Sequence, residues 1–215
     1  MDPAVVEHLR QGVLGLILII VSIGLHEFGH AWVADLRGDP LPRAQGRVSL
    51  NPFVHADPIG TILIPAVMIF LSPGVGLIGW GKPVQVALLN PRTRRADDLL
   101  ITLAGPGMNL LLCLAFALIG GLGGFAQGPT KDFLERGLLL NAGLIAFNLI
   151  PVPPLDGSRV ALRLGLFSEQ VFMALARWGF IILLVLVNLP PFRMLLWTAL
   201  QFIATPWFVL WVSLL

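Results

Sequence analysis

The sequence predicts an all-α polytopic membrane protein, and composition is the first reason. Of the 215 residues, 56% are apolar and only 12% are charged, against roughly half and a quarter in an ordinary soluble domain. The formal net charge of +2 gives no sign of a nucleic-acid-binding surface. Because each span needs about 20 apolar residues, the chain has room for about 5 or 6 transmembrane helices. We therefore predict one membrane-embedded domain over residues 1–215.

Apolar runs are the second reason. Residues 1–11 are too polar for the start of a cleavable signal sequence, so we expect the first run to be a retained helix. The second run is short and contains two prolines and two glycines, which favours a re-entrant hairpin over a crossing. The candidate segments are residues 12–34, 61–78, 99–122, 137–151 and two C-terminal stretches separated by residues 188–191.

Three ionisable residues, His26, Glu27 and His30, interrupt the first apolar run. Such residues are costly inside a bilayer and are usually functional there. At 3.6 residues per turn, His26 and His30 share one face of a helix, so both imidazoles can reach one metal ion. The adjacent Glu27 can accept a proton from water, as in the HExxH pattern of zinc peptidases. The alternative is a structural histidine pair with a buried carboxylate as its counter-ion.

A catalytic zinc site needs a third protein ligand and an open position for water. Two candidates remain, Asp156 and His55. Asp156 follows an apolar segment and three prolines, and irregular backbone at membrane depth is tolerated where it is buried in protein or lines a wet cavity. As alternatives, Asp156 could be a turn residue and His55 a loop residue. We interpret Asp97 and Asp98 as part of a solvated charge cluster.

Several motifs together resemble the site-2 protease family of intramembrane zinc metalloproteases, peptidase family M50. HExxH in an early helix is followed by Gly105-Pro106-xx-Asn109 and by Asn148-xx-Pro151-xxx-Leu155-Asp156-Gly157. Residues 46–60 and 79–84 are similar to a compact branch of that family. The resemblance implies a form without PDZ or CBS domains, with a catalytic core over about residues 12–157 and C-terminal helices over about 168–215.

The resemblance also implies the roles of individual residues. It assigns one Zn²⁺ ion to His26, His30 and Asp156, makes Glu27 the general base, and has Asn148 hold the substrate or the tetrahedral oxyanion. For Asn148, the alternative is an amide that packs helices.

Two more residues are candidates for lining the site. They are His55 and Asn109. His55 could be a fourth ligand, a substrate-side acid or a loop residue that bonds Asp57. For Asn109, packing at a helix junction is favoured over direct substrate contact.

Topology follows from the metal ligands. The two histidines and Asp156 each lie towards the end of an apolar run, so their helices must run in the same direction through the membrane. This favours five crossings plus a re-entrant segment at 61–78. The division of the 14 Lys and Arg residues then becomes ten against four, with the majority on the side of the site. Because cytoplasmic loops collect Lys and Arg, we expect the site to face the cytoplasm. The localisation expected is a multi-pass protein of a prokaryotic plasma membrane.

The function expected is hydrolysis of peptide bonds within or near transmembrane segments of membrane proteins, as in regulated intramembrane proteolysis. Residues 43–50 and 82–87 are predicted to be short β-strands near the site, which in this family hold substrate; a hairpin that merely seals the site is the alternative. Partners would be transmembrane substrates, the lipid bilayer and separate regulatory proteins, with no nucleic acid. The competing hypotheses are a membrane metal transporter or sensor, which would need no Glu27, and an inactive adaptor.

Overall fold

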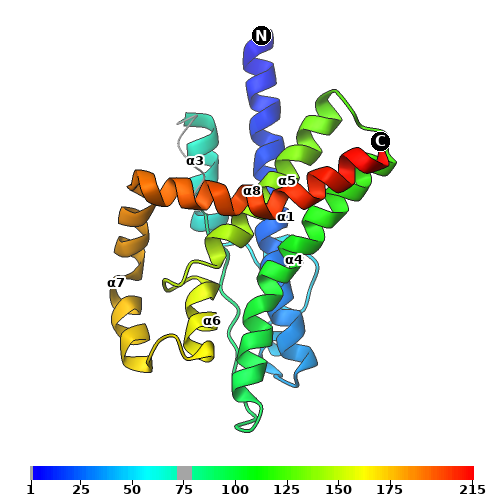
Figure 1. Cartoon of the computed structure of the whole chain (residues 1–215). Helices are drawn as coiled ribbons and strands as arrows, with labels where there is room; N and C mark the ends of the chain where they lie inside the picture. Colours follow the sequence, from blue (N-terminus) through cyan, green and yellow to red (C-terminus); the bar gives the residue numbers. More distant parts are fainter. Residues whose placement is uncertain (1, 72–78) are drawn as a thin grey trace. The chain divides into compact units, whose positions relative to one another are not determined.

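The computed structural model describes residues 2–71 and 79–215 (Figure 1). The chain divides into two units, Met1–Ala87 and Leu88–Leu215. Regular secondary structure in the described residues is helical, which confirms the predicted all-α class.

The first unit is built on α1, Pro3–Leu36. The helix begins where the Asp2 carboxylate accepts a hydrogen bond from the Ala4 amide, with proline at the first helical position, a combination that favours helix initiation. Its 34 residues extend about 51 Å at 1.5 Å per residue, more than the roughly 30 Å of a hydrocarbon core. The predicted segment 12–34, with its HExxH motif, therefore lies within one uninterrupted helix.

Short helices complete this unit. They are α2 (Leu41–Ala44), η1 (Pro52–Val54), the π-helix η2 (Pro58–Leu63) and α3 (Ile64–Leu71). The Asp57 carboxylate caps η2 by accepting hydrogen bonds from the Ile59 and Gly60 amides at 3.0 and 2.7 Å. The described part of the second apolar run, Pro58–Leu71, is about 21 Å long by helix rise. Residues 72–78 of the predicted re-entrant segment lie outside the described residues, so the re-entrant hairpin stays a prediction.

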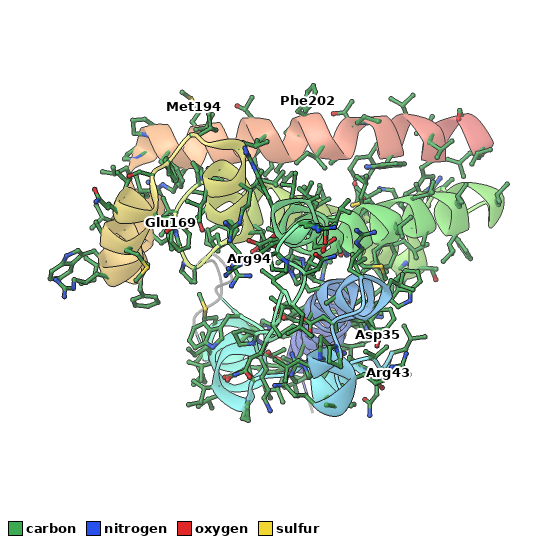
Figure 2. All side chains as sticks on the ribbon, turned by 90° about the horizontal axis from the view of Figure 1, so that it is seen from below. Asp35, Arg43, Arg94, Glu169, Met194 and Phe202 are labelled. Carbon is green, nitrogen blue, oxygen red and sulfur yellow. The ribbon has the colours of Figure 1, made fainter. Side chains whose placement is uncertain are left out.

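The second unit packs three long helices together: α4 (Arg94–Leu122), α5 (Pro129–Asn148) and α8 (Pro190–Leu214). α8 crosses the other two (Figure 1). Glycine on α4 allows this close approach, since a Cβ at Gly120 would collide with the Trp211 ring. Met194 and Phe202 lie on the outer side of α8 and project outward from it (Figure 2). They are 69% and 82% exposed, as is typical of a lipid-facing surface.

Two further helices, α6 (Asp156–Leu164) and α7 (Glu169–Asn188), connect α5 to α8. The Ser168 hydroxyl accepts a hydrogen bond from the Val171 amide and caps α7. α7 ends at Asn188 and α8 begins at Pro190, because proline has no amide to continue a preceding helix and fits the first position of a new one. The predicted separation of two C-terminal helices at 188–191 is confirmed.

Four of the described helices are long and apolar enough to cross a membrane: α1, α4, α7 and α8. α5 has 20 residues, but its first two turns contain four charged side chains. The protein is therefore a membrane protein by the length and composition of its helices. The count of 5 or 6 crossings remains a prediction.

The two predicted β-strands are absent from the described residues. Residues 43–50 instead finish α2 and continue through turns, and 82–87 have no regular secondary structure. Only an isolated antiparallel bridge joins Ala56 to Gly81 within the part of the chain described. The physical reason is that the backbone of 82–87 is bound at its ends by other groups: the Lys82 amide donates to the His55 carbonyl at 2.8 Å, and the Ala87 amide donates to an Asp39 carboxylate oxygen at 2.5 Å.

Candidate metal centre

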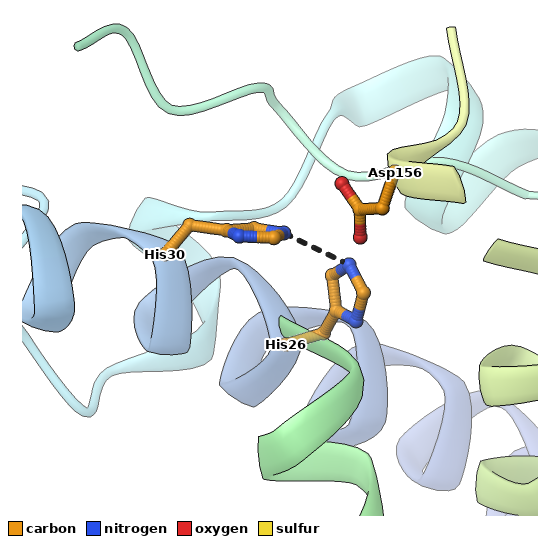
Figure 3. A group of neighbouring side chains, drawn as sticks. All are labelled: His26, His30 and Asp156. Atoms are coloured by element: carbon orange, nitrogen blue, oxygen red, sulfur yellow. Dashed lines mark hydrogen bonds between the residues drawn. The ribbon is translucent and has the colours of Figure 1, made fainter. Parts of the chain in front are cut away.

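His26 and His30 lie one turn apart on α1, and their rings approach each other (Figure 3). Their Nε2 atoms are 3.1 Å apart, and the ring centroids are 4.7 Å apart. A tetrahedral zinc ion bound by two imidazole nitrogens at about 2.0–2.1 Å would hold those nitrogens about 3.3 Å apart. The pair therefore fits one zinc ion with little movement of either side chain.

Glu27 lies next to this pair, with its side chain 13% exposed. On one side it meets Gly81, where a Cβ atom would lie 2.7 Å from the Glu27 Cγ and 2.9 Å from its Oε1. On another side, the Arg47 Nη2 lies 4.0 Å from the Glu27 Oε2. The carboxylate is thus confined between a glycine backbone and a buried cation.

Arg47 also holds the segments around Glu27. Its Nη1 donates to the Val54 carbonyl at 2.8 Å, and its Nη2 donates to the Lys82 carbonyl. Burial lowers the pKa of the guanidinium below its ordinary value, and the charge of Glu27 opposes that shift. The arginine stays charged, so one side chain connects η1, the segment after residue 79 and the carboxylate of α1.

His55 is fully buried in the same unit. Its Nε2 lies 2.8 Å from the Ser49 carbonyl oxygen, and its ring contacts Phe28 of α1 edge-on, with centroids 6.4 Å apart. Within the described part of the chain, its Nδ1 is buried without a hydrogen-bond partner. The loop role weighed for His55 therefore involves Ser49 rather than Asp57, whose carboxylate caps η2. A site-lining role for His55 stays a prediction.

Burial gives His55 a testable pH dependence. Desolvation, together with the charge of Arg47, lowers the pKa of His55, although the Ser49 carbonyl opposes the shift. The unfolded chain, with a histidine pKa of about 6.5, therefore takes up a proton at higher pH than the folded chain, and stability falls as the pH drops below about 6.5. We expect thermal unfolding of the metal-free protein in detergent to show a smaller loss of Tm between pH 7.5 and 5.5 in His55→Gln than in wild type. Equal losses of Tm in the two proteins would show that protonation of His55 does not cause this pH dependence.

Asp156, the third predicted ligand, is the first residue of α6 in the second unit. Figure 3 shows its carboxylate at the beginning of that helix. At Gly157 a Cβ would lie 2.6 Å from the Ile150 carbonyl oxygen and closer still to that of Leu149, so a glycine is required for α6 to begin against the end of α5. Asp156 offers a carboxylate oxygen as a ligand atom, and each histidine offers a ring nitrogen.

The two candidate asparagines make different bonds. Asn148 ends α5 and donates from Nδ2 to the Leu144 carbonyl of its own helix at 3.0 Å. Asn109 is fully buried and donates to the Asn141 Oδ1 at 2.8 Å, while the Asn141 amide donates to the Gly137 carbonyl. Asn109 therefore connects α4 to α5 at a helix junction. Asn148 lies at the end of α5, and the bond of its amide is to the backbone of the same helix.

Three features near the candidate ligands were missed or misread from the sequence. Asp98 is buried rather than solvated, because it pairs with two arginines of α6, and Asp97 is also buried and accepts a hydrogen bond from Thr93. The confinement of Glu27 by Arg47 and Gly81 was not foreseen. The spacing of two arginines, at 159 and 163, indicates only that they share one side of a helix, and it does not identify the acidic residue that they contact.

An apolar helix with converging imidazoles and an adjacent glutamate defines a membrane protein with a zinc-compatible site.

The chain is 37% identical over 196 residues to "Putative zinc metalloprotease YwhC" of Bacillus subtilis (strain 168), and the match covers 86% of this chain and 85% of that protein. It is 30% identical over 176 residues to "Putative zinc metalloprotease Rip2" of Mycolicibacterium smegmatis, covering 80% of this chain and 65% of that protein. Mycobacterium tuberculosis (strain ATCC 35801 / TMC 107 / Erdman) Rip2 is 32% identical over 142 residues, 64% of this chain and 52% of that protein.

The chain belongs to the zinc metalloprotease family of YwhC and Rip2. It spans less than two thirds of the length of the Rip2 proteins that it matches. No protein-family model and no solved structure matches the chain.

Proposed function

We propose that the chain is a site-2-type intramembrane zinc peptidase of peptidase family M50, in which His26, His30 and Asp156 bind one zinc ion. The observation that carries the proposal is the pair of Nε2 atoms 3.1 Å apart on an apolar helix. Two imidazoles and one carboxylate form a ligand set of catalytic zinc, which leaves a fourth position open. The names of the relatives support zinc as the metal.

The chain's own residues would then divide the chemistry. Zinc, when bound, supplies a Lewis acid that polarises the scissile carbonyl and lowers the pKa of water towards neutrality. Glu27 takes the proton of the attacking water as the new C–O bond forms, and gives it to the leaving amine as the C–N bond breaks. The Asn148 amide, released from the Leu144 carbonyl, donates to the developing oxyanion. Gly81 and Arg47 restrict where the Glu27 carboxylate can lie.

We also propose five crossings, α1, α4, α5, α7 and α8, with a re-entrant segment over residues 61–78. This arrangement places ten of the 14 Lys and Arg residues on the side of the candidate site, which would be the cytoplasmic side of a prokaryotic plasma membrane. α5 would cross with its charged first turns at the opposite surface, where water and headgroups can solvate them.

Substrates would be transmembrane helices that are locally unwound before cleavage. A helical peptide bond is hydrogen-bonded and packed, and an extended segment of the enzyme can hold an unwound one by pairing with it. Residues 82–87 form no regular secondary structure and are hydrogen-bonded at Lys82 and Ala87, and we propose that the backbone between these two residues pairs with the substrate. We also propose that separate proteins regulate the enzyme and that nucleic acid is not a partner.

Quantitative proteomics of membrane fractions tests this function and identifies the substrate. Cells that lack the gene would express either wild type or Glu27→Gln. We expect one or more shortened transmembrane proteins to accumulate only with the variant, because their further cleavage stops. Equal membrane proteomes in the two strains, at equal expression of the protease, would contradict an endopeptidase acting on membrane proteins.

Gly81→Ala tests whether the position of Glu27 matters. The new methyl group would overlap Glu27 and would lie 2.9 Å from the Ile23 side chain, so the carboxylate must shift. A misplacement of about 1 Å can lower a rate about 100-fold, and we expect kcat to fall by about that factor with zinc content unchanged. Cleavage of a transmembrane reporter in liposomes gives kcat. Gly15→Ala on α1 is the control, because a Cβ there meets only an ordinary contact at 3.7 Å; equal rates for both variants would refute the confinement.

A further inference from the structure

Asp98 lies near the beginning of α4, with its side chain only 4% exposed. Its Oδ2 accepts a hydrogen bond from the Arg163 Nε, and its Oδ1 lies 3.7 Å from the Arg159 Nη1. Both arginines belong to α6. A carboxylate at this depth is costly unless it is paired, so Asp98 is held in place by α6 and holds α6 in turn.

The two arginines share one side of α6 with Asp156. They follow it by three and seven residues, and residues with these spacings lie above one another on a helix. A second bond reinforces the contact, since the Arg95 Nε donates to the Arg163 carbonyl at 2.5 Å. The beginning of α4 is therefore attached to the helix face from which Asp156 projects.

α6 needs such external contacts because it is short. It has nine residues, and helices of that length are marginal in isolation. Its beginning is fitted against the end of α5 at Gly157, and a Cβ at Gly179 of α7 would overlap the Pro153 carbonyl just before α6. These close approaches fix where α6 starts. Asp98 contacts α6 further along its length, and there it fixes the direction and the rotation of the helix.

We propose that Asp98 is a positioning residue for the metal site: through Arg159 and Arg163 it orients α6, so that the Asp156 carboxylate is presented in the geometry a zinc ligand requires. This inference rests on the proposed role of Asp156 as a ligand. Groups that orient metal ligands typically change metal affinity by about 10- to 100-fold when they are removed. Asp98 would act one step further away, through the helix.

The test measures Zn²⁺ affinity of the purified full-length protein by competition with a chromophoric chelator. We expect Asp98→Asn, which keeps the side-chain shape, to weaken Zn²⁺ binding about 10-fold. Arg163→Gln is the second variant and is expected to weaken it in the same direction. Asp132→Asn is the matched control, because that aspartate is exposed in the first turn of α5, and its affinity should equal that of wild type.

A double-mutant cycle distinguishes positioning from general stability. In an Asp156→Asn background, Asp98→Asn should cause no further loss of Zn²⁺ affinity, because its effect passes through the missing ligand. Equal losses in both backgrounds, or wild-type affinity in both Asp98→Asn and Arg163→Gln, would overturn the inference. If Asp156→Asn alone leaves the Zn²⁺ affinity unchanged, Asp156 is not a zinc ligand. That result would contradict the proposed function rather than the positioning role of Asp98.

Discussion

Glu27→Gln is expected to abolish peptide cleavage while Zn²⁺ stays bound. The amide keeps the size of the side chain within the space left by Gly81 and Arg47, but it cannot accept the proton of the attacking water. General-base catalysis contributes about 10²–10⁴-fold to a rate, and we expect kcat to fall by about 1,000-fold or more. Cleavage of a fluorescent transmembrane reporter in liposomes, together with zinc content by mass spectrometry, measures both quantities.

Glu7→Gln is the matched control for this experiment. Glu7 lies on the same helix and forms an exposed ion pair with Arg10 at 2.7 Å, so the same chemical change should leave kcat within about two-fold, since exposed ion pairs contribute little. Residual cleavage by Glu27→Gln at more than a tenth of the wild-type rate would exclude Glu27 as the base. Such a result, with zinc retained, would favour a site that binds metal for another purpose, such as transport or sensing.

His30→Ala is expected to lose both zinc and activity. His30 supplies one of two Nε2 atoms that lie 3.1 Å apart, and the remaining histidine cannot hold a tetrahedral ion with one carboxylate at comparable affinity. Loss of groups outside the ligand shell already costs about 10–100-fold in metal affinity, so loss of a ligand should cost more than about 100-fold. Chelator competition gives the affinity, and the reporter assay gives the activity.

The control for this loss is His8→Ala. His8 is also on α1, but it is exposed and its ring lies 6.3 Å from that of Phe70, so its removal should change neither zinc affinity nor cleavage. Circular dichroism of the metal-free proteins checks that both variants remain folded. If His30→Ala bound Zn²⁺ as tightly as His8→Ala, the histidine pair on α1 would not be the metal site.

The helices were predictable because their signals are local. A run of about 20 apolar residues indicates a helix without knowledge of its neighbours, and α1, α4, α7 and α8 follow such runs. The ionisable groups of α1 were equally visible, since His26, Glu27 and His30 stand alone in an apolar segment. The boundary between α7 and α8 was predicted correctly for the same reason, because the proline pair that marks it is a local signal.

Non-local contacts were beyond the reach of these patterns. Residues 82–87 alternate like a strand, but their ends are bound by the His55 carbonyl and by the Asp39 side chain, more than 25 residues away. Asp98 reads as solvated because arginines stand beside it in the sequence, whereas its observed partners come from α6, more than 60 residues later. Arg47 likewise reaches Glu27 only through the fold. Each error therefore arose where tertiary pairing outweighed local pattern.

Mapping the cleaved bond tests the central claim most directly. Purified protein in liposomes would be incubated with a transmembrane reporter that contains glycine or proline in its membrane segment, and mass spectrometry would identify the ends of the products. We predict a cut within or at the border of the membrane segment, lost in Glu27→Gln and after zinc chelation, and restored to wild type by added Zn²⁺. A cut confined to the reporter's extramembrane region, or one that persists in Glu27→Gln, would contradict an intramembrane zinc peptidase.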